Sequence, residues 1–174
     1  MATPDVACTK ENFEVYVQRM SSKDWDWSTF AEQAEQKPEL KRAQIRMVGG
    51  SITGVHDEPG TIPAGNFTVS FMKVPPGNLA SSHAHPDTEE AFFILEGEAR
   101  GWWENAETGE VFEANLSRHD MIMSPAHMMH GIQNVGDNDL VVQVLIGAQK
   151  PEKPYFMDTD LGDSKYALHG EKTD

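Results

Sequence analysis

The chain has 174 residues, of which 39% are hydrophobic and 24% are charged, and its excess of acidic side chains gives a formal net charge of −14. This composition is typical of a folded globular protein and excludes a collagen-like or low-complexity chain. The negative charge disfavours binding to nucleic acid and to anionic membrane surfaces, because both would repel it. The expected partner is a small-molecule substrate, with no nucleic acid and no membrane.

Cys8 is the only cysteine, so no disulfide can form within the chain. The N-terminus has no basic start followed by an apolar run, so it does not resemble a secretory signal peptide. No stretch approaches the roughly 20 apolar residues that a membrane-spanning helix needs. These features predict a cytoplasmic, reducing location.

Residues 1–42 are predicted to form a helical N-terminal arm. Thr9 could start a first helix whose apolar face would carry side chains at three- and four-residue spacing, namely Phe13, Tyr16, Val17 and Met20. Ser28 could cap a second helix, which Lys37-Pro38 would end, since the residue before proline avoids helical angles. Trp25 and Trp27 lie between the two helices and would either pack the arm onto the body or line the entrance to a pocket.

Residues 43–148 contain short β-like runs separated by turn residues. We expect strands at 43–48, 67–74, 91–95, 99–104, 111–114, 121–123, 131–135 and 140–146. Many short strands at this spacing predict an all-β sandwich or barrel rather than alternating strands and helices. Residues 149–174 are expected to form a tail that is partly docked on the barrel.

Three histidines and one glutamate in this region have a spacing that suits a metal ion. His83 and His85 would point to the same face of a strand, where they would bind a metal together. Glu90 opens an apolar run, where a carboxylate is costly unless a counter-charge such as a divalent metal accompanies it. His130 would add a third imidazole. Three imidazoles and one carboxylate would leave an octahedral ion two positions, one for substrate and one for water or dioxygen. The alternative is an exposed His-x-His pair in a loop.

The same residues resemble the two sequence motifs of the cupin superfamily. The first motif is matched by Gly77, His83, His85, Glu90 and Gly97, and the second by Pro125, His130 and Asn134. The spacing to Gly97 favours Glu90 over Glu89 as the ligand. His119 and His127 occupy two usual glycine positions of the second motif, which puts the local turns in question. The resemblance covers roughly residues 43–147 and implies an antiparallel double-stranded β-helix, the jelly-roll barrel, with a metal inside it.

Other side chains are candidates for the substrate pocket. The apolar wall is expected to include Phe71, Phe92, Trp102, Ile132 and Leu145. Gln143 and His127 are candidates for a catalytic role beside the metal, as a hydrogen-bond donor or as an acid or base. His56 and His169 are expected on the surface.

The leading functional hypothesis that the resemblance implies is a mononuclear non-haem iron(II) dioxygenase that acts on a small aromatic or oxo-containing molecule. Fe(II) is the expected metal, with Mn, Ni, Zn or Cu as alternatives. A second hypothesis is a redox-neutral decarboxylase, lyase or isomerase of a small oxo acid or sugar derivative. A third is a cupin that binds a small ligand without catalysis. The resemblance also implies a homodimer.

Overall fold

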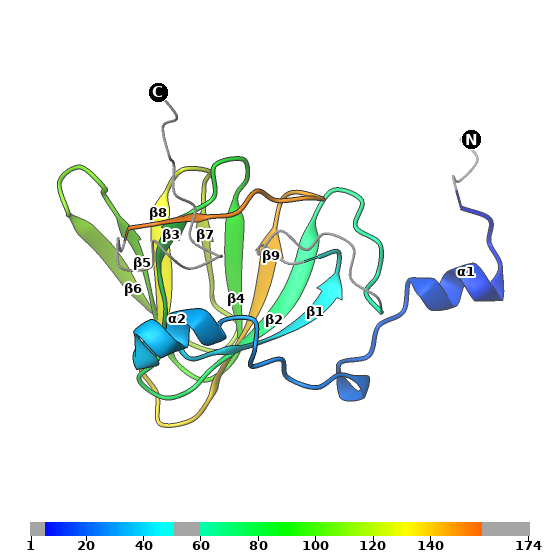
Figure 1. Ribbon diagram of the computed structural model, residues 1–174, viewed down its shortest axis with the longest axis horizontal. Helices are drawn as coiled ribbons and strands as arrows, with labels where there is room; N and C mark the ends of the chain where they lie inside the picture. Colours follow the sequence, from blue (N-terminus) through cyan, green and yellow to red (C-terminus); the bar gives the residue numbers. More distant parts are fainter. Residues whose placement is uncertain (1–5, 51–59, 158–174) are drawn as a thin grey trace.

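Two β-sheets dominate the computed structural model, which describes residues 6–50 and 60–157 (Figure 1). One sheet has the strand order β1-β2-β9-β4-β7 and the other has the order β10-β3-β8-β5-β6, and all neighbouring strands are antiparallel. The strands of the first sheet are β1 (Ala43–Val48), β2 (Thr68–Val74), β9 (Leu140–Ile146), β4 (Glu90–Glu96) and β7 (Met121–Ser124). Those of the second are β10 (Tyr155–Phe156), β3 (Leu79–Ala84), β8 (Met129–Asn134), β5 (Ala99–Glu104) and β6 (Val111–Leu116).

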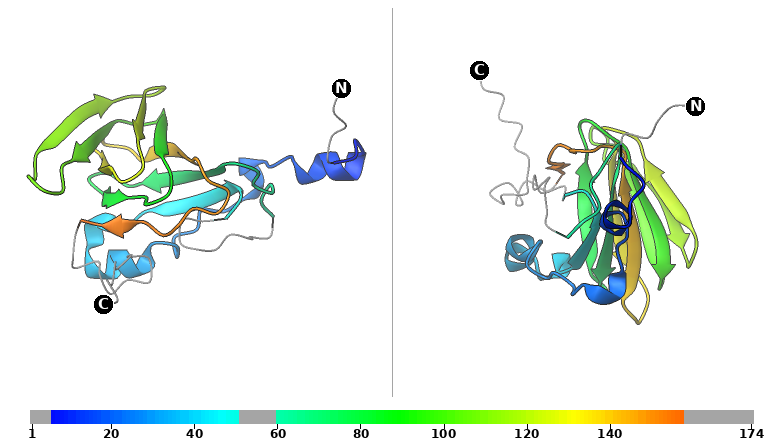
Figure 2. Two further views of the ribbon diagram at one scale, coloured as in Figure 1. Left: turned by 90° about the horizontal axis from the view of Figure 1, so that it is seen from above. Right: turned by 90° about the vertical axis from the view of Figure 1, so that its right-hand side faces the viewer.

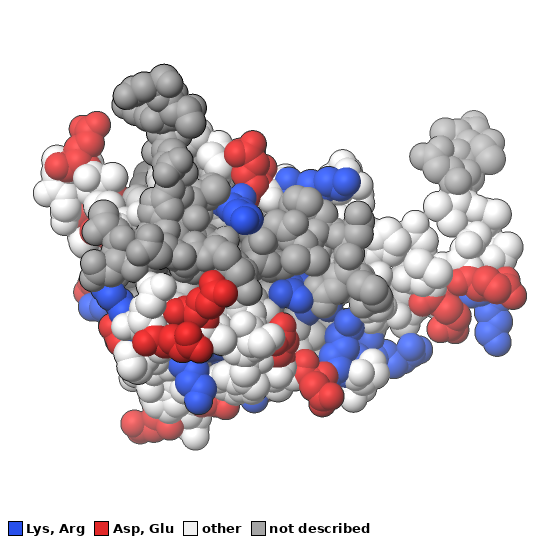
Figure 3. Space-filling view, viewed as in Figure 1, with Lys and Arg blue, Asp and Glu red and all other residues white. Residues whose placement is uncertain are grey.

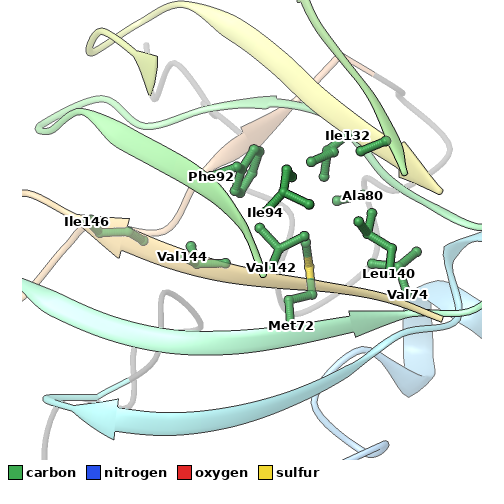
Figure 4. Packing of buried hydrophobic residues seen from close by; sticks show 11 residues of the cluster. Met72, Val74, Ala80, Phe92, Ile94, Ile132, Leu140, Val142, Val144 and Ile146 are labelled. Carbon is green, nitrogen blue, oxygen red and sulfur yellow. The ribbon is translucent and has the colours of Figure 1, made fainter. Parts of the chain in front are cut away.

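The hydrophobic core lies between the two sheets, which face each other (Figure 2). Successive side chains of a strand point to opposite faces, so each strand supplies alternate residues to the core. In β9 these are the even-numbered residues, Leu140 to Ile146, and they pack against Met72, Val74, Phe92, Ile94 and Ile132 (Figure 4). This arrangement confirms the predicted all-β jelly-roll fold, and its alternation decides which polar side chains point inward.

The N-terminal arm contains α1 (Lys10–Val15), η1 (Met20–Ser22), α2 (Ala31–Gln36) and η2 (Pro38–Leu40). As predicted, Thr9 caps α1, its hydroxyl oxygen accepting a hydrogen bond from the backbone N–H of Asn12 at 3.2 Å. The predicted apolar face of this helix is not buried, however, because α1 extends away from the barrel (Figures 1 and 2). Phe13 is 65% exposed and Tyr16 is 47% exposed.

The second helix of the arm lies against the barrel. Ser28 does not cap it, because the backbone N–H and the hydroxyl of Ser28 both donate to a carboxylate oxygen of Asp26. The helix ends as predicted before Lys37, whose backbone is extended ahead of Pro38. No helix within the described residues has the length and apolar content to cross a membrane.

Two tryptophans of the arm each pack on a lysine, one in the barrel and one in the arm itself. Lys73 Nζ lies 4.8 Å from the ring centroid of Trp25, and Lys41 Nζ lies 5.6 Å from that of Trp27. The contact of Trp25 with Lys73 of β2 favours the first of the two roles considered for the tryptophans, which is to pack the arm onto the body. On the face shown in Figure 3, basic side chains lie interspersed with acidic ones.

The two histidines at usual glycine positions both have left-handed backbone conformations, with φ of 76° at His119 and 66° at His127. The tight turns of the motif are therefore kept, although a side chain other than glycine is strained in this region by about 1–3 kcal/mol. The backbone N–H of His127 donates to the carbonyl of His85, and that of His119 donates to the carbonyl of Ile94.

Replacing His127 with Gly is expected to stabilise the fold by about 1 kcal/mol, because the relief of strain exceeds the greater chain entropy that glycine gives the unfolded state. The His127 side chain is exposed, so little packing is lost. Thermal unfolding should show a rise in Tm of roughly 2–4 °C. The matched variant His127→Ala keeps a Cβ in the left-handed region and should show no gain. A fall in Tm for the glycine variant would contradict the strain.

Candidate metal centre

The four predicted ligands come together from both sheets. The three histidines lie on or beside β3 and β8 of the second sheet, and the glutamate lies at the start of β4 in the first sheet. His83 is near the end of β3 and faces His130 of β8 across the strand pair. His85 follows β3 by one residue, and Glu90 is the first residue of β4. Each of these side chains is at most 5% exposed. Glu89, the alternative ligand, is exposed and has the opposite strand parity.

The four side chains converge on one point. The Glu90 Oε2 atom lies 2.7 Å from Nε2 of His130, 3.0 Å from Nε2 of His83 and 3.4 Å from Nε2 of His85. One ligand atom from each residue lies within 4.8 Å of all the others. Neighbouring ligand atoms around an ion with bonds of about 2.0–2.2 Å are separated by about 3 Å, so these spacings suit a shared metal.

The orientation of the imidazoles provides a sharper test of whether a cation fits. Nδ1 of His83 lies 2.8 Å from the carbonyl oxygen of Ser81, and Nδ1 of His130 lies 2.8 Å from that of Met128. A carbonyl can only accept, so both Nδ1 atoms donate and neutral rings turn their Nε2 lone pairs toward the centre. These lone pairs then face a carboxylate oxygen, which is repulsive unless a cation lies among them.

His85 supports the same conclusion. Its side chain is 1% exposed, yet neither ring nitrogen has a hydrogen-bond partner among the described residues. An imidazole buried without partners is costly, and binding a metal through Nε2 would satisfy one of its nitrogens. The residues therefore fit a divalent metal ion.

The electrostatics of the site favour the protonation states that ligands need. Burial, together with the neighbouring His130, lowers the pKa of His83 to about 4, so that its ring is neutral at pH 7. Burial alone would raise the pKa of Glu90, but contacts with His85, His130 and His83 outweigh it and hold that pKa well below its usual range. A neutral imidazole and an ionised carboxylate are the forms that bind metals.

A cavity of about 30 Å³, measured as the space open to the centres of water molecules, adjoins two of the ligands, His83 and Glu90. Phe92 is the one predicted wall residue that lines it, and its ring centroid lies 5.7 Å from that of His130. The other lining residues come from the arm, from the four strands β1, β2, β3 and β9, and from the C-terminal segment: Phe30, Gln33, Arg42, Gln44, Met72, Ala80, Val144, Pro154 and Phe156.

Several predicted pocket residues lie elsewhere. Phe71, Gln143 and Leu145 have the opposite parity to the core residues of β2 and β9, so they are on the outer face of their sheet. Trp102 also faces outward, and its indole N–H donates to the hydroxyl of Ser82. Ile132 is inside, but in the core rather than at the cavity wall. These positions correct the predicted wall and remove Gln143 as a group beside the metal.

The remaining histidines are not part of the four-residue cluster. His127 is exposed and lines a separate depression with Trp103, Phe112 and Met128, so it does not touch the cavity. His119 is exposed and its ring is stacked on that of Phe93. His56 and His169 lie outside the described residues.

Three polar side chains in the cavity wall were not predicted from the sequence: Gln33, Arg42 and Gln44. Arg42, Gln44 and Arg46 alternate with Ala43, Ile45 and Met47, a pattern that would normally place the polar residues in solvent. Here Gln44 lies opposite the inward-facing Met72, and Phe30 and Gln33 of the arm line the same cavity as Arg42 and Gln44. No local pattern in the sequence indicates that the polar residues of this strand face the cavity instead of solvent.

A buried cluster of three histidines and a glutamate inside a two-sheet jelly roll defines a β-barrel protein of the cupin type with a candidate metal site. The family model for cupins matches residues 36–168. The chain belongs to the cupin family.

The known proteins similar to this chain include a plant germin-like protein and a bacterial reductase. The germin-like protein subfamily 2 member 3 of Arabidopsis thaliana is 28% identical over 106 residues, 60% of this chain and 48% of that protein. A UDP-2-acetamido-2,6-beta-L-arabino-hexul-4-ose reductase of Pseudomonas aeruginosa is 31% identical over 86 residues, 48% of this chain and 23% of that protein. The chain thus spans about half the length, or less, of these relatives.

Among solved structures, an oxalate oxidase in complex with the substrate analogue glycolate has a TM-score of 0.62 at 18% identity, covering 89% of this chain and 70% of that one. The oxalate decarboxylase of Lactobacillus farciminis has a TM-score of 0.55 at 19% identity, covering 71% and 33%. At these identities the likeness supports the fold.

Proposed function

We propose that this cupin is a mononuclear metal-dependent enzyme that uses iron(II) and dioxygen to oxidise a small oxo-containing molecule. The observation that carries the proposal is the convergence of three Nε2 atoms and one carboxylate oxygen beside a small cavity lined mostly by apolar side chains. The name of the similar oxalate oxidase supports the use of oxygen, and the size of the cavity supports a small substrate.

The residues of the chain would perform binding, orientation and the exclusion of water. His83, His85, Glu90 and His130 would hold the ion. When bound, iron(II) supplies Lewis acidity and the electrons that activate dioxygen. Met72, Phe92, Val144 and Phe156 line the cavity with apolar groups, which keep bulk water from the reacting atoms.

The cavity volume supports one of the two substrate classes that the sequence predicts. A cavity needs about 150 Å³ to hold a benzene ring and about 10–15 Å³ to hold one water molecule. The space of about 30 Å³ therefore suits a few atoms beside the metal rather than an aromatic ring. We infer that the substrate is a small oxo or hydroxy compound.

The test is oxygen consumption by protein of known metal content. The protein is purified without added metal, its metals are quantified, and iron-loaded and zinc-loaded samples are screened with small oxo and hydroxy acids in an oxygen electrode. We expect uptake of oxygen with the iron-loaded sample alone. Turnover without oxygen uptake would contradict the oxygenase and favour a redox-neutral cupin enzyme.

A further inference from the structure

Three polar side chains are buried in the wall of the cavity that contains the metal ligands. Gln33 of α2 is fully buried, and Arg42 and Gln44 are each 5% exposed. All three line the same cavity as His83 and Glu90. Buried arginines and glutamines are rare unless their polar atoms have partners, so the partners of each atom indicate what this wall is for.

Arg42 is held firmly from one side. Its Nη1 donates to the carbonyl of Leu40 and its Nη2 donates to Oε1 of Gln33, each at 2.8 Å. Its guanidinium carbon lies 3.8 Å from the ring centroid of Phe30, so the group is also stacked on an aromatic face. These contacts fix the orientation of the guanidinium before any ligand arrives.

Three atoms of this wall have no hydrogen-bond partner among the described residues: Nε of Arg42, Nε2 of Gln33 and Oε1 of Gln44. The first two are donors and the third is an acceptor. Leaving buried donors and an acceptor unpaired is costly, and a well-packed apolar side chain at position 42 would avoid this cost. The unpaired set therefore points to a ligand that completes it.

The charges of the wall indicate the sign of that ligand. Of the residues that line the cavity, Arg42 and Glu90 are the only ones with ordinary charges at pH 7. Burial lowers the pKa of Arg42 to about 9, while the charge of Glu90 raises it, so the guanidinium remains positive at neutral pH. With a divalent ion on neutral imidazoles and Glu90, the buried site would be positive even before Arg42 is counted. A small anion would compensate this charge.

We propose that Arg42 and Gln33 form an anion-binding wall that holds the carboxylate of a small oxo or hydroxy acid, with Gln44 accepting from a hydroxyl where the acid has one. The rest of the acid then lies at the metal ligands. The inference rests on the proposed metal centre and adds to it the class of substrate and the residues that select it. An arginine fork in a dry site recognises a carboxylate far better than a neutral group of the same shape.

The experiment measures binding of acetate and of its neutral isostere acetamide by calorimetry, with zinc-loaded and metal-free protein of known zinc content. The variants are Arg42→Met, which removes the charge, and Gln33→Glu, which keeps the acceptor for Arg42 Nη2 but replaces a donor with a negative charge. Arg100→Met is the matched control, because Arg100 lies on the outer face of the other sheet, paired with Gln133 and Glu113. Circular dichroism and zinc content are recorded for every variant.

Wild-type protein and Arg100→Met are expected to bind acetate in preference to acetamide. Arg42→Met and Gln33→Glu should weaken acetate binding by about 10- to 100-fold while retaining zinc, the scale of one or two charged hydrogen bonds. Equal binding of acetate and acetamide, or unchanged acetate affinity in a folded Arg42→Met or Gln33→Glu protein, would overturn the anion-binding wall alone. Failure of wild-type protein to hold zinc would overturn the metal centre. The anion-binding wall would still be supported if metal-free wild-type protein binds acetate and the Arg42→Met variant does not.

Discussion

Replacing Glu90 with Gln is expected to weaken metal binding by at least about 100-fold, since even partners that only orient metal ligands contribute about 10- to 100-fold. Glu90 supplies the only negative charge among the four converging ligands, and its Oε2 lies within 3.4 Å of all three Nε2 atoms. The measurement is metal content after dialysis, together with competition against a chelator of known affinity.

Glu89→Gln is the matched control for this experiment. Glu89 is the neighbouring residue, has the same chemistry and is exposed on the opposite face of the chain, so its replacement should leave metal binding unchanged. Equal losses in the two variants would refute the assignment of Glu90 as the ligand.

The same pair of variants gives a second, independent readout in the metal-free state. There the Glu90 carboxylate faces Nε2 lone pairs, whereas a glutamine amide can donate to them. Metal-free Glu90→Gln protein is therefore expected to unfold at the same temperature as wild-type protein or higher. A large loss of stability would indicate a structural carboxylate instead.

The metal-free protein should lose stability as the pH falls from about 6.5 toward 4. The pKa of His83 is about 4 in the folded state and 6.5 in the unfolded chain, so the unfolded state takes up a proton first. The contribution of neutral His83 to the free energy of unfolding is fully present above pH 6.5 and is lost as the pH falls. The loss reaches about 3 kcal/mol once the pH is below both the folded and the unfolded pKa of His83.

Urea unfolding at a series of pH values measures this loss, and His83→Gln is the control that should flatten the upper part of the profile. Bound metal should shift the whole loss to lower pH, because protons and metal compete for the same nitrogens. Constant stability of the metal-free protein between pH 7 and 5 would contradict the buried, neutral His83.

The metal cluster could be predicted from the sequence for two reasons. Its residues fall in two short motifs of defined spacing, and side chains along a strand alternate strictly between its two faces. This alternation puts the side chains of His83 and His85 on the same face and those of Glu89 and Glu90 on opposite faces. The sequence pattern does not indicate the strand that carries His83, because β3 (Leu79–Ala84) has little apolar alternation. Its register shift between Ala80 and His83 is set by pairing with β8, which no local pattern encodes.

The cavity wall could not be predicted for a related reason. An aromatic or apolar residue in a strand faces either the core or the opposite side, and the choice depends on which face the rest of the molecule covers. Residue type predicts Phe71 and Leu145 in the cavity wall, yet their strands place them on the outer face of the sheet. The converse holds for Arg42, because a charged residue just before a strand ordinarily points to solvent.

The cavity is lined in part by residues that precede β1 in the sequence, Phe30 and Gln33, and by residues that follow β9, Pro154 and Phe156. None of these residues belongs to either ligand motif. The residues that line this part of the cavity can therefore be changed, by evolution or by engineering, without replacing a metal ligand. A library confined to residues 30–44 and 151–156 could change which acid enters, or enlarge the chamber, while every metal ligand stays as it is.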